Sequence, residues 1–84
     1  IEIVFVADKR KDIEPFLDIL RKNFIPNKIV LLKTPMNEKE LSTIAEYTQE
    51  MEMIDNKPTV YLCRNYACEM PVSDVREFAG ELGD

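Results

Sequence analysis

Three short apolar runs rich in β-branched residues alternate with segments of helical hydrophobic period, and this alternation limits the fold more than any other feature. The runs lie at residues 1–6, 28–33 and 59–63. Between and after them, apolar residues recur at intervals of three and four, as on one face of an α-helix. Strands that alternate with helices pair in parallel through helical crossovers. The sequence therefore predicts an α/β fold, a small β-α-β-α-β-α sandwich whose three-stranded parallel sheet has the order 2-1-3.

The three expected helices have recognisable starts. The first is expected over residues 12–24, with Pro15 in the first turn, where a missing amide hydrogen is tolerated. The second is expected to begin at Asn37, followed three residues later by Glu40 as in a capping box, and to reach residues 51–54. Ser73 is the expected N-cap of the third. Their apolar faces consist of Ile13, Phe16, Leu17, Leu20 and Phe24 in the first helix, of Leu41, Ile44, Ala45, Thr48 and Met51 in the second, and of Val75, Phe78, Ala79 and Leu82 in the third.

Length and charge narrow the class of protein. We expect one domain, residues 1–84, because a chain of 84 residues is too short for two. A net charge of −5 argues against binding to nucleic acid or to anionic membranes, which need a basic surface. No run approaches the roughly 18 apolar residues of a membrane span. The first residue is Ile1 rather than methionine, so we expect a piece of a larger protein. Two cysteines are too few for a disulfide-rich secreted scaffold, so the cytoplasm is the expected compartment.

Both cysteines, Cys63 and Cys68, lie at the end of the third predicted strand and in the loop expected after it. Their spacing is C-x4-C, which differs from the C-x-x-C of thioredoxin-type redox sites. Three interpretations remain open: two small buried hydrophobic side chains, a structural or reversible disulfide, and half of a thiolate metal site. The chain has no histidine, so carboxylates or a second chain would have to complete a metal site.

Other candidate sites are weaker. The first strand–helix connection, residues 7–12, contains no glycine, so we do not expect a nucleotide phosphate there. In this connection Asp8 is either a ligand contact or a helix cap, and the basic residues 9–11 either bind an anion or face solvent. Tyr61 and Tyr66 either stack on a ligand or pack at the rim of the core. Without histidine there is no imidazole base, and we expect no catalytic residue and no cofactor.

Residues 61–72 resemble the closing Y-x-C-x-N-x-x-C-x-x-P-V segment of the large thioredoxin-domain-containing proteins, the spermatogenesis-associated thioredoxin-like family. Residues 24–32 are similar to that family's F-x-P-N-K-V-V-L-L stretch. The resemblance implies a C-terminal α/β domain that follows a thioredoxin-like domain and an α/α toroid similar to sugar epimerases and glycosidases. The positions that match the cysteine pattern are Tyr61, Cys63, Asn65, Cys68 and Pro71. The resemblance gives none of them a catalytic role.

The expected function is that of a non-catalytic accessory or interaction domain, whose partners are the thioredoxin-like domain and the toroid of the same chain. This hypothesis predicts an exposed apolar patch, because a domain separated from its neighbour loses cover. The first alternative is a thiol–disulfide redox site at Cys63 and Cys68, which requires Cα atoms within about 7 Å of each other. The second is an intermolecular thiolate metal site at the same two residues.

Overall fold

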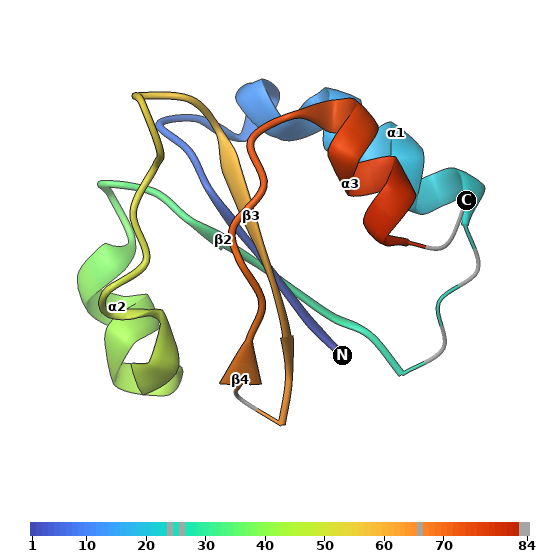
Figure 1. Ribbon diagram of the computed structural model, residues 1–84. Helices are drawn as coiled ribbons and strands as arrows, with labels where there is room; N and C mark the ends of the chain where they lie inside the picture. The colour runs from blue at the N-terminus through green and yellow to red at the C-terminus, as the bar shows by residue number, and fades with distance from the viewer. Residues whose placement is uncertain (24, 26, 66, 83–84) are drawn as a thin grey trace.

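The structure, a computed structural model, describes residues 1–23, 25, 27–65 and 67–82. Within these ranges the chain forms one mixed sheet of four strands and three α-helices (Figure 1). The strands are β1 (Glu2–Val6), β2 (Ile29–Lys33), β3 (Thr59–Arg64) and β4 (Ala67–Cys68). The α-helices are α1 (Glu14–Lys22), α2 (Glu38–Ile44) and α3 (Val75–Glu81), while the 3-10 helices η1 (Arg10–Ile13) and η2 (Glu46–Thr48) precede α1 and follow α2. The predicted α/β class is confirmed.

The sheet has the order β2-β1-β3-β4, so the three predicted strands are neighbours as expected. β1 and β2 are parallel, with Glu2 opposite Ile29. β3 is antiparallel to β1, with Glu2 opposite Cys63 and Val6 opposite Thr59. β4 then returns antiparallel to β3, in a part of the chain where a loop was expected. The prediction of a three-stranded, all-parallel sheet is therefore wrong.

The direction of β3 follows from the early end of α2. That helix stops at Ile44, Ala45 leaves helical geometry with φ −132° and ψ 83°, and residues 49–54 run back toward the carboxyl end of β1. We call residues 49–54 the return segment. In a longer helix the carbonyl oxygens of Thr48 and Gln49 would accept from amides four residues later. Here both accept from the ammonium group of Lys33. This tertiary contact replaces the helix expected as far as residues 51–54.

The core has two parts, one on each face of the sheet. On the face covered by α1 and α3, three phenylalanines from β1, α1 and α3 (Phe5, Phe16 and Phe78) meet with ring centroids 5.5–5.9 Å apart. On the opposite face, Val4, Val6, Met51 and Cys63 form a smaller buried cluster. Figure 1 shows α1 and α3 together on one side of the sheet and α2 on the other. The second face is thus closed largely by the return segment rather than by a full-length helix.

The predicted apolar face of the first helix is confirmed in the described residues, that of the second is wrong beyond Leu41 because α2 ends at Ile44 and Ile44 is exposed, and the predicted caps are not confirmed. Ile13, Phe16 and Leu20 are buried, whereas Phe24 and Pro26 lie outside the described residues. The N-cap of α3 is Asp74 rather than Ser73. The carboxylate of Asp74 accepts hydrogen bonds from the amides of Arg76 and Glu77.

Asn37 precedes α2 but makes no capping hydrogen bond. Its side chain accepts from the amide of Thr34 and donates to the carbonyl oxygen of Leu32. Asn37 therefore fixes the connection after β2 instead of the start of the helix. Among the helices in the described ranges, none has the length and apolar character required to cross a bilayer.

Candidate functional site

Cys63 and Cys68 form a disulfide bond, with their Cα atoms 3.9 Å apart. The interpretation of two unlinked buried thiols is therefore wrong, since neither cysteine is free. In the disulfide neither sulfur is a thiolate, and the part of the chain that the structure describes contains no cluster of three or more potential metal-ligating side chains. The geometry thus gives no support to a metal site and leaves the disulfide as the candidate site.

A tight hairpin places the two cysteines opposite each other. β3 ends at Arg64, and Asn65 begins the two-residue connection with φ 52°, a left-handed conformation that asparagine tolerates. The amide of Glu69 donates to the carbonyl oxygen of Leu62 at 2.9 Å, which marks those two residues as a hydrogen-bonded pair. The adjacent pair, the two cysteines, is therefore non-hydrogen-bonded, and in such pairs the side chains of the two strands are closest.

The two sulfur-bearing residues differ in exposure. Cys63 is fully buried and packs in the cluster of Val4, Val6 and Met51. Cys68 is exposed on β4, which is the edge strand of the sheet next to β3. Thiol–disulfide exchange begins when a thiolate attacks one sulfur and displaces the other. An external thiolate would therefore approach Cys68, and Cys63 would leave as the buried thiolate.

The other positions of the family pattern have structural contacts in the same region. The hydroxyl group of Tyr61 donates to the carbonyl oxygen of Glu52 at 2.8 Å and accepts from its amide at 3.1 Å. Tyr61 thereby attaches the return segment to β3. Asn65 forms the hairpin turn, and Pro71 precedes Val72, whose main chain pairs with Val60. The structure brings the two cysteines together, while Tyr61 and Asn65 shape the strand contact and the turn beside them.

Tyr66, the second tyrosine considered for stacking, lies outside the described residues. Asp8, the candidate ligand contact, is exposed just after β1. In the neighbouring basic run, Arg10 forms an ion pair with Glu14 at 3.7 Å. The structure therefore places these charges at the surface.

Lys33 is a buried charged residue that the sequence reasoning missed. It is only 8% exposed, and its Nζ atom donates to the carbonyl oxygens of Thr48 (2.8 Å), Gln49 (3.2 Å) and Met51 (2.7 Å). The available signal was its place at the end of a strand, where side-chain alternation directs it toward the buried cluster on the α2 face.

A cavity of about 260 Å³ lies beside Lys33, at the carboxyl ends of β1 and β2. Ligands of α/β proteins commonly bind at such strand ends. An ammonium group has three donors, however, and the three carbonyl oxygens engage all of them. Lys33 therefore stabilises the return segment and has no donor left for a ligand.

Sequence comparison finds relatives in three mammals. The chain is 30% identical to spermatogenesis-associated protein 20 of Rattus norvegicus, 27% to that of Homo sapiens and 28% to that of Mus musculus, each over 74 residues. The chain is distantly related to spermatogenesis-associated protein 20. This relation supports the resemblance of residues 61–72 to that thioredoxin-domain-containing family. The alignments cover 87% of this chain but only 9% of each relative.

No family model matches the chain, and no solved structure matches it. The relation to spermatogenesis-associated protein 20 therefore stands on the sequence alignments and on the cysteine segment.

Proposed function

We propose that this chain is a non-catalytic accessory domain of a larger thioredoxin-domain-containing protein, and that it acts by packing against the rest of that protein. The observation that carries the proposal is the coverage of the relatives, in which 87% of this chain corresponds to 9% of a much longer protein. A matching segment in those proteins has many neighbours available for contact.

Exposed apolar side chains support this proposal. Among the residues that the structure describes, the large apolar ones that face solvent are Ile29, Val30, Met36, Ile44 and Met70. Ile44 is 82% exposed although it belongs to the apolar face expected for the second helix. Ile29 and Val30 are adjacent on β2, an outer strand of the sheet. Exposed apolar side chains on an edge strand and on a helix are available for contact with another protein surface.

The topology supports a more specific inference about fold. The order β2-β1-β3-β4, with β1 parallel to β2 and β3 antiparallel to both neighbours, is the core arrangement of the thioredoxin fold. In redox-active members of that fold, a C-x-x-C motif in the β1–α1 connection places its reactive thiol at a helix N-terminus, which lowers the thiol pKa. Here residues 7–12 contain no cysteine. We infer a thioredoxin-like domain without the dithiol of that connection.

The disulfide lies elsewhere in this topology. Cys63 is opposite Glu2, at the amino end of β1, whereas the β1–α1 connection follows Val6 at the other end. Because a fold hosts many functions, the topology alone assigns no activity to the bridge.

The accessory function is tested in the longer protein. The protein is produced without this domain, and the isolated chain is added back while association is followed by calorimetry. We expect a complex with a dissociation constant of about 10 µM or tighter. We also expect the joined protein to unfold at a higher temperature than either part alone. Two parts that neither associate nor stabilise each other would contradict the proposal.

A redox function of Cys63 and Cys68 is the second candidate, and the exposure of Cys68 favours it. The deciding measurement is the reduction potential in glutathione buffers. A potential near −270 mV, about that of thioredoxin, would support reversible cycling, whereas a value below about −300 mV is typical of structural disulfides.

A further inference from the structure

The outer edge of β2 is open over part of its length. The amide of Ile29 donates to the carbonyl oxygen of Ile1, and the carbonyl oxygen of Lys33 accepts from the amide of Ala7. These bonds show that the main-chain N–H and C=O groups of Ile29 and Lys33 point toward β1. By the alternation along a strand, the main-chain groups of Val30 and of its neighbours two residues away point outward.

One end of this edge is already covered. The carbonyl oxygen of Leu32 accepts a hydrogen bond of 2.7 Å from the side chain of Asn37. The outward N–H and C=O groups of Val30 have no hydrogen-bond partner among the described residues. The open stretch is therefore short and is centred on Val30, which is 40% exposed.

A groove of about 230 Å³ borders the same stretch, between β2 and α1. Its apolar lining consists of Leu17, Leu20 and Val30, and its charged lining consists of Arg10, Arg21 and Lys28. A peptide strand paired with β2 would direct every second side chain into this groove, because side chains alternate across a sheet. Main-chain hydrogen bonds would provide affinity, and the groove would select the side chain.

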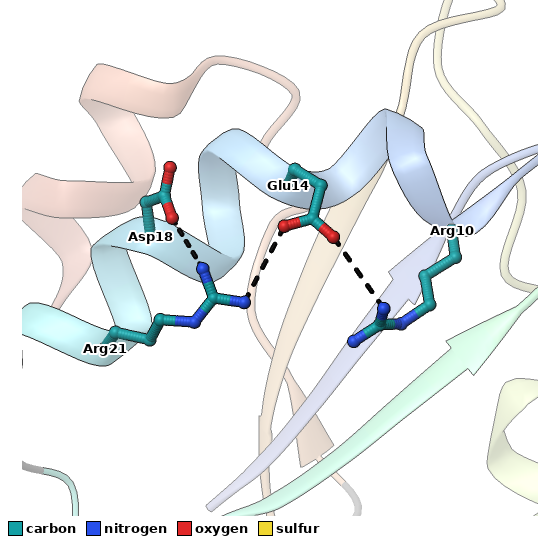
Figure 2. Close-up of polar contacts among 4 residues, drawn as sticks. All are labelled: Arg10, Glu14, Asp18 and Arg21. Carbon is teal, nitrogen blue, oxygen red and sulfur yellow. Dashed lines mark hydrogen bonds and ion pairs between the residues drawn. The ribbon is translucent and has the colours of Figure 1, made fainter.

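The groove has a positive rim although the whole chain carries a net charge of −5. Figure 2 shows Arg10 and Arg21 reaching Glu14 from opposite sides, each at 3.7 Å, while Arg21 also pairs with Asp18 at 2.6 Å. The two contacts to Glu14 are longer than hydrogen bonds, and the arginine side chains are 71% and 61% exposed. Three cations, with Lys28, therefore face only two carboxylates, and the arginines can still donate hydrogen bonds.

We propose that the β2 edge and this groove bind an extended acidic segment of the longer protein, which adds a fifth strand to the sheet. The segment carries an apolar side chain between two carboxylates at alternate positions, acid-x-apolar-x-acid. The apolar side chain lies against Leu17, Leu20 and Val30, and the carboxylates pair with the cations of the rim. A second copy of this chain fits poorly, because pairing two β2 edges brings two sets of the same cations together. This inference rests on the accessory function proposed above.

The first test uses two synthetic peptides and the isolated chain. One peptide has the sequence glutamate-threonine-valine-threonine-glutamate with blocked ends, and the control has lysine in place of both glutamates. Binding is followed by the NMR chemical shifts of the backbone amides of the chain. We expect the chemical-shift changes to be centred on Val30, and we expect the control peptide to bind about tenfold or more weakly than the acidic peptide. Equal binding of the two peptides, or changes located on α2 or α3, would overturn the inference.

Two variants and a matched control locate the contact. Val30→Pro removes an outward N–H group that the β1–β2 ladder does not use, and proline is tolerated at such edge positions. Arg10→Glu reverses an exposed charge of the rim without touching the strand. Each is expected to weaken binding of the acidic peptide by about tenfold. Lys39→Glu, an exposed reversal on α2, is expected to leave binding unchanged.

The same variants, added to the longer protein that lacks this domain, separate this inference from the accessory function. Weakened association of Val30→Pro and Arg10→Glu supports both the docking surface and the accessory function. Normal association of both variants overturns the docking surface and leaves the accessory function standing. Failure of the unmodified chain to associate contradicts the accessory function itself. A chain that dimerises through β2, with dimerisation lost in Val30→Pro, overturns the inference in favour of a second copy.

Discussion

Replacing Lys33 by methionine removes the ammonium group but keeps an unbranched apolar side chain. In the structure that group donates to the carbonyl oxygens of Thr48 and Met51 in buried hydrogen bonds, and to that of Gln49 in a partly buried one. A hydrogen bond to a charged group contributes about 1.5–3 kcal/mol, and a buried carbonyl left without a donor costs about 1–3 kcal/mol. The variant no longer buries the ammonium charge of Lys33, and the free-energy cost of that burial is removed, which offsets part of this loss. We expect the free energy of unfolding to fall by about 3 kcal/mol, out of about 4–12 kcal/mol for a domain of this length.

Urea unfolding followed by circular dichroism measures this loss. With a slope of about 1 kcal/mol per molar urea, the midpoint should fall by about 3 M. Lys39→Met removes an exposed lysine from α2 and is the matched control, expected within about 0.5 kcal/mol of the unmodified chain. The series is repeated with added sulfate, which stabilises folded chains, so that a weakened variant stays measurable. If Lys33→Met also unfolds within about 0.5 kcal/mol of the unmodified chain, the three carbonyl contacts do not hold the return segment.

The remaining predictions use the same unfolding assay. Replacing Cys63 and Cys68 together by serine should lower the free energy of unfolding by about 2 kcal/mol, the value expected for so short a loop, and reductant should lower that of the unmodified chain by a similar amount; an unchanged midpoint in both would count against a stabilising bridge. Tyr61→Phe removes both hydrogen bonds to the main chain of Glu52 and should cost about 1 kcal/mol, so an unchanged midpoint would show that the return segment does not need them. Asp74→Ala should cost about 1 kcal/mol as a lost N-cap and Ser73→Ala almost nothing, and the reverse order would restore the prediction made from sequence.

Local patterns predicted the positions of α1, α3 and the first three strands, but they placed the end of the second helix too late and missed β4. The apolar face of α1 follows from a period that no distant contact changes, and β1 is recognisable because it is buried on both faces. The direction of β3 is different, since its apolar pattern is the same when read either way. That direction depends on where the preceding connection ends, and the connection is set by Lys33 and Tyr61, whose partners lie more than eight positions away in sequence.

The disulfide was predictable only in part. A C-x4-C spacing brings cysteines face to face when a two-residue turn lies at its centre, and Asn65 is suited to such a turn. The same residues also fit a strand end followed by a loop, which is why the bridge remained one of several interpretations. No local pattern reveals the groove at β2, because it exists only where α1 and the strand edge meet.

The location of the disulfide within a single hairpin also has a kinetic consequence. The bridge closes a loop between residues that are already neighbours in sequence, so it brings no distant segments together. Pairing of Val6 with Thr59 still requires most of the chain to close into a loop, and contacts of such long range set the speed of folding. Oxidised and reduced chains should therefore fold at similar rates. Stopped-flow refolding with and without reductant compares the two directly.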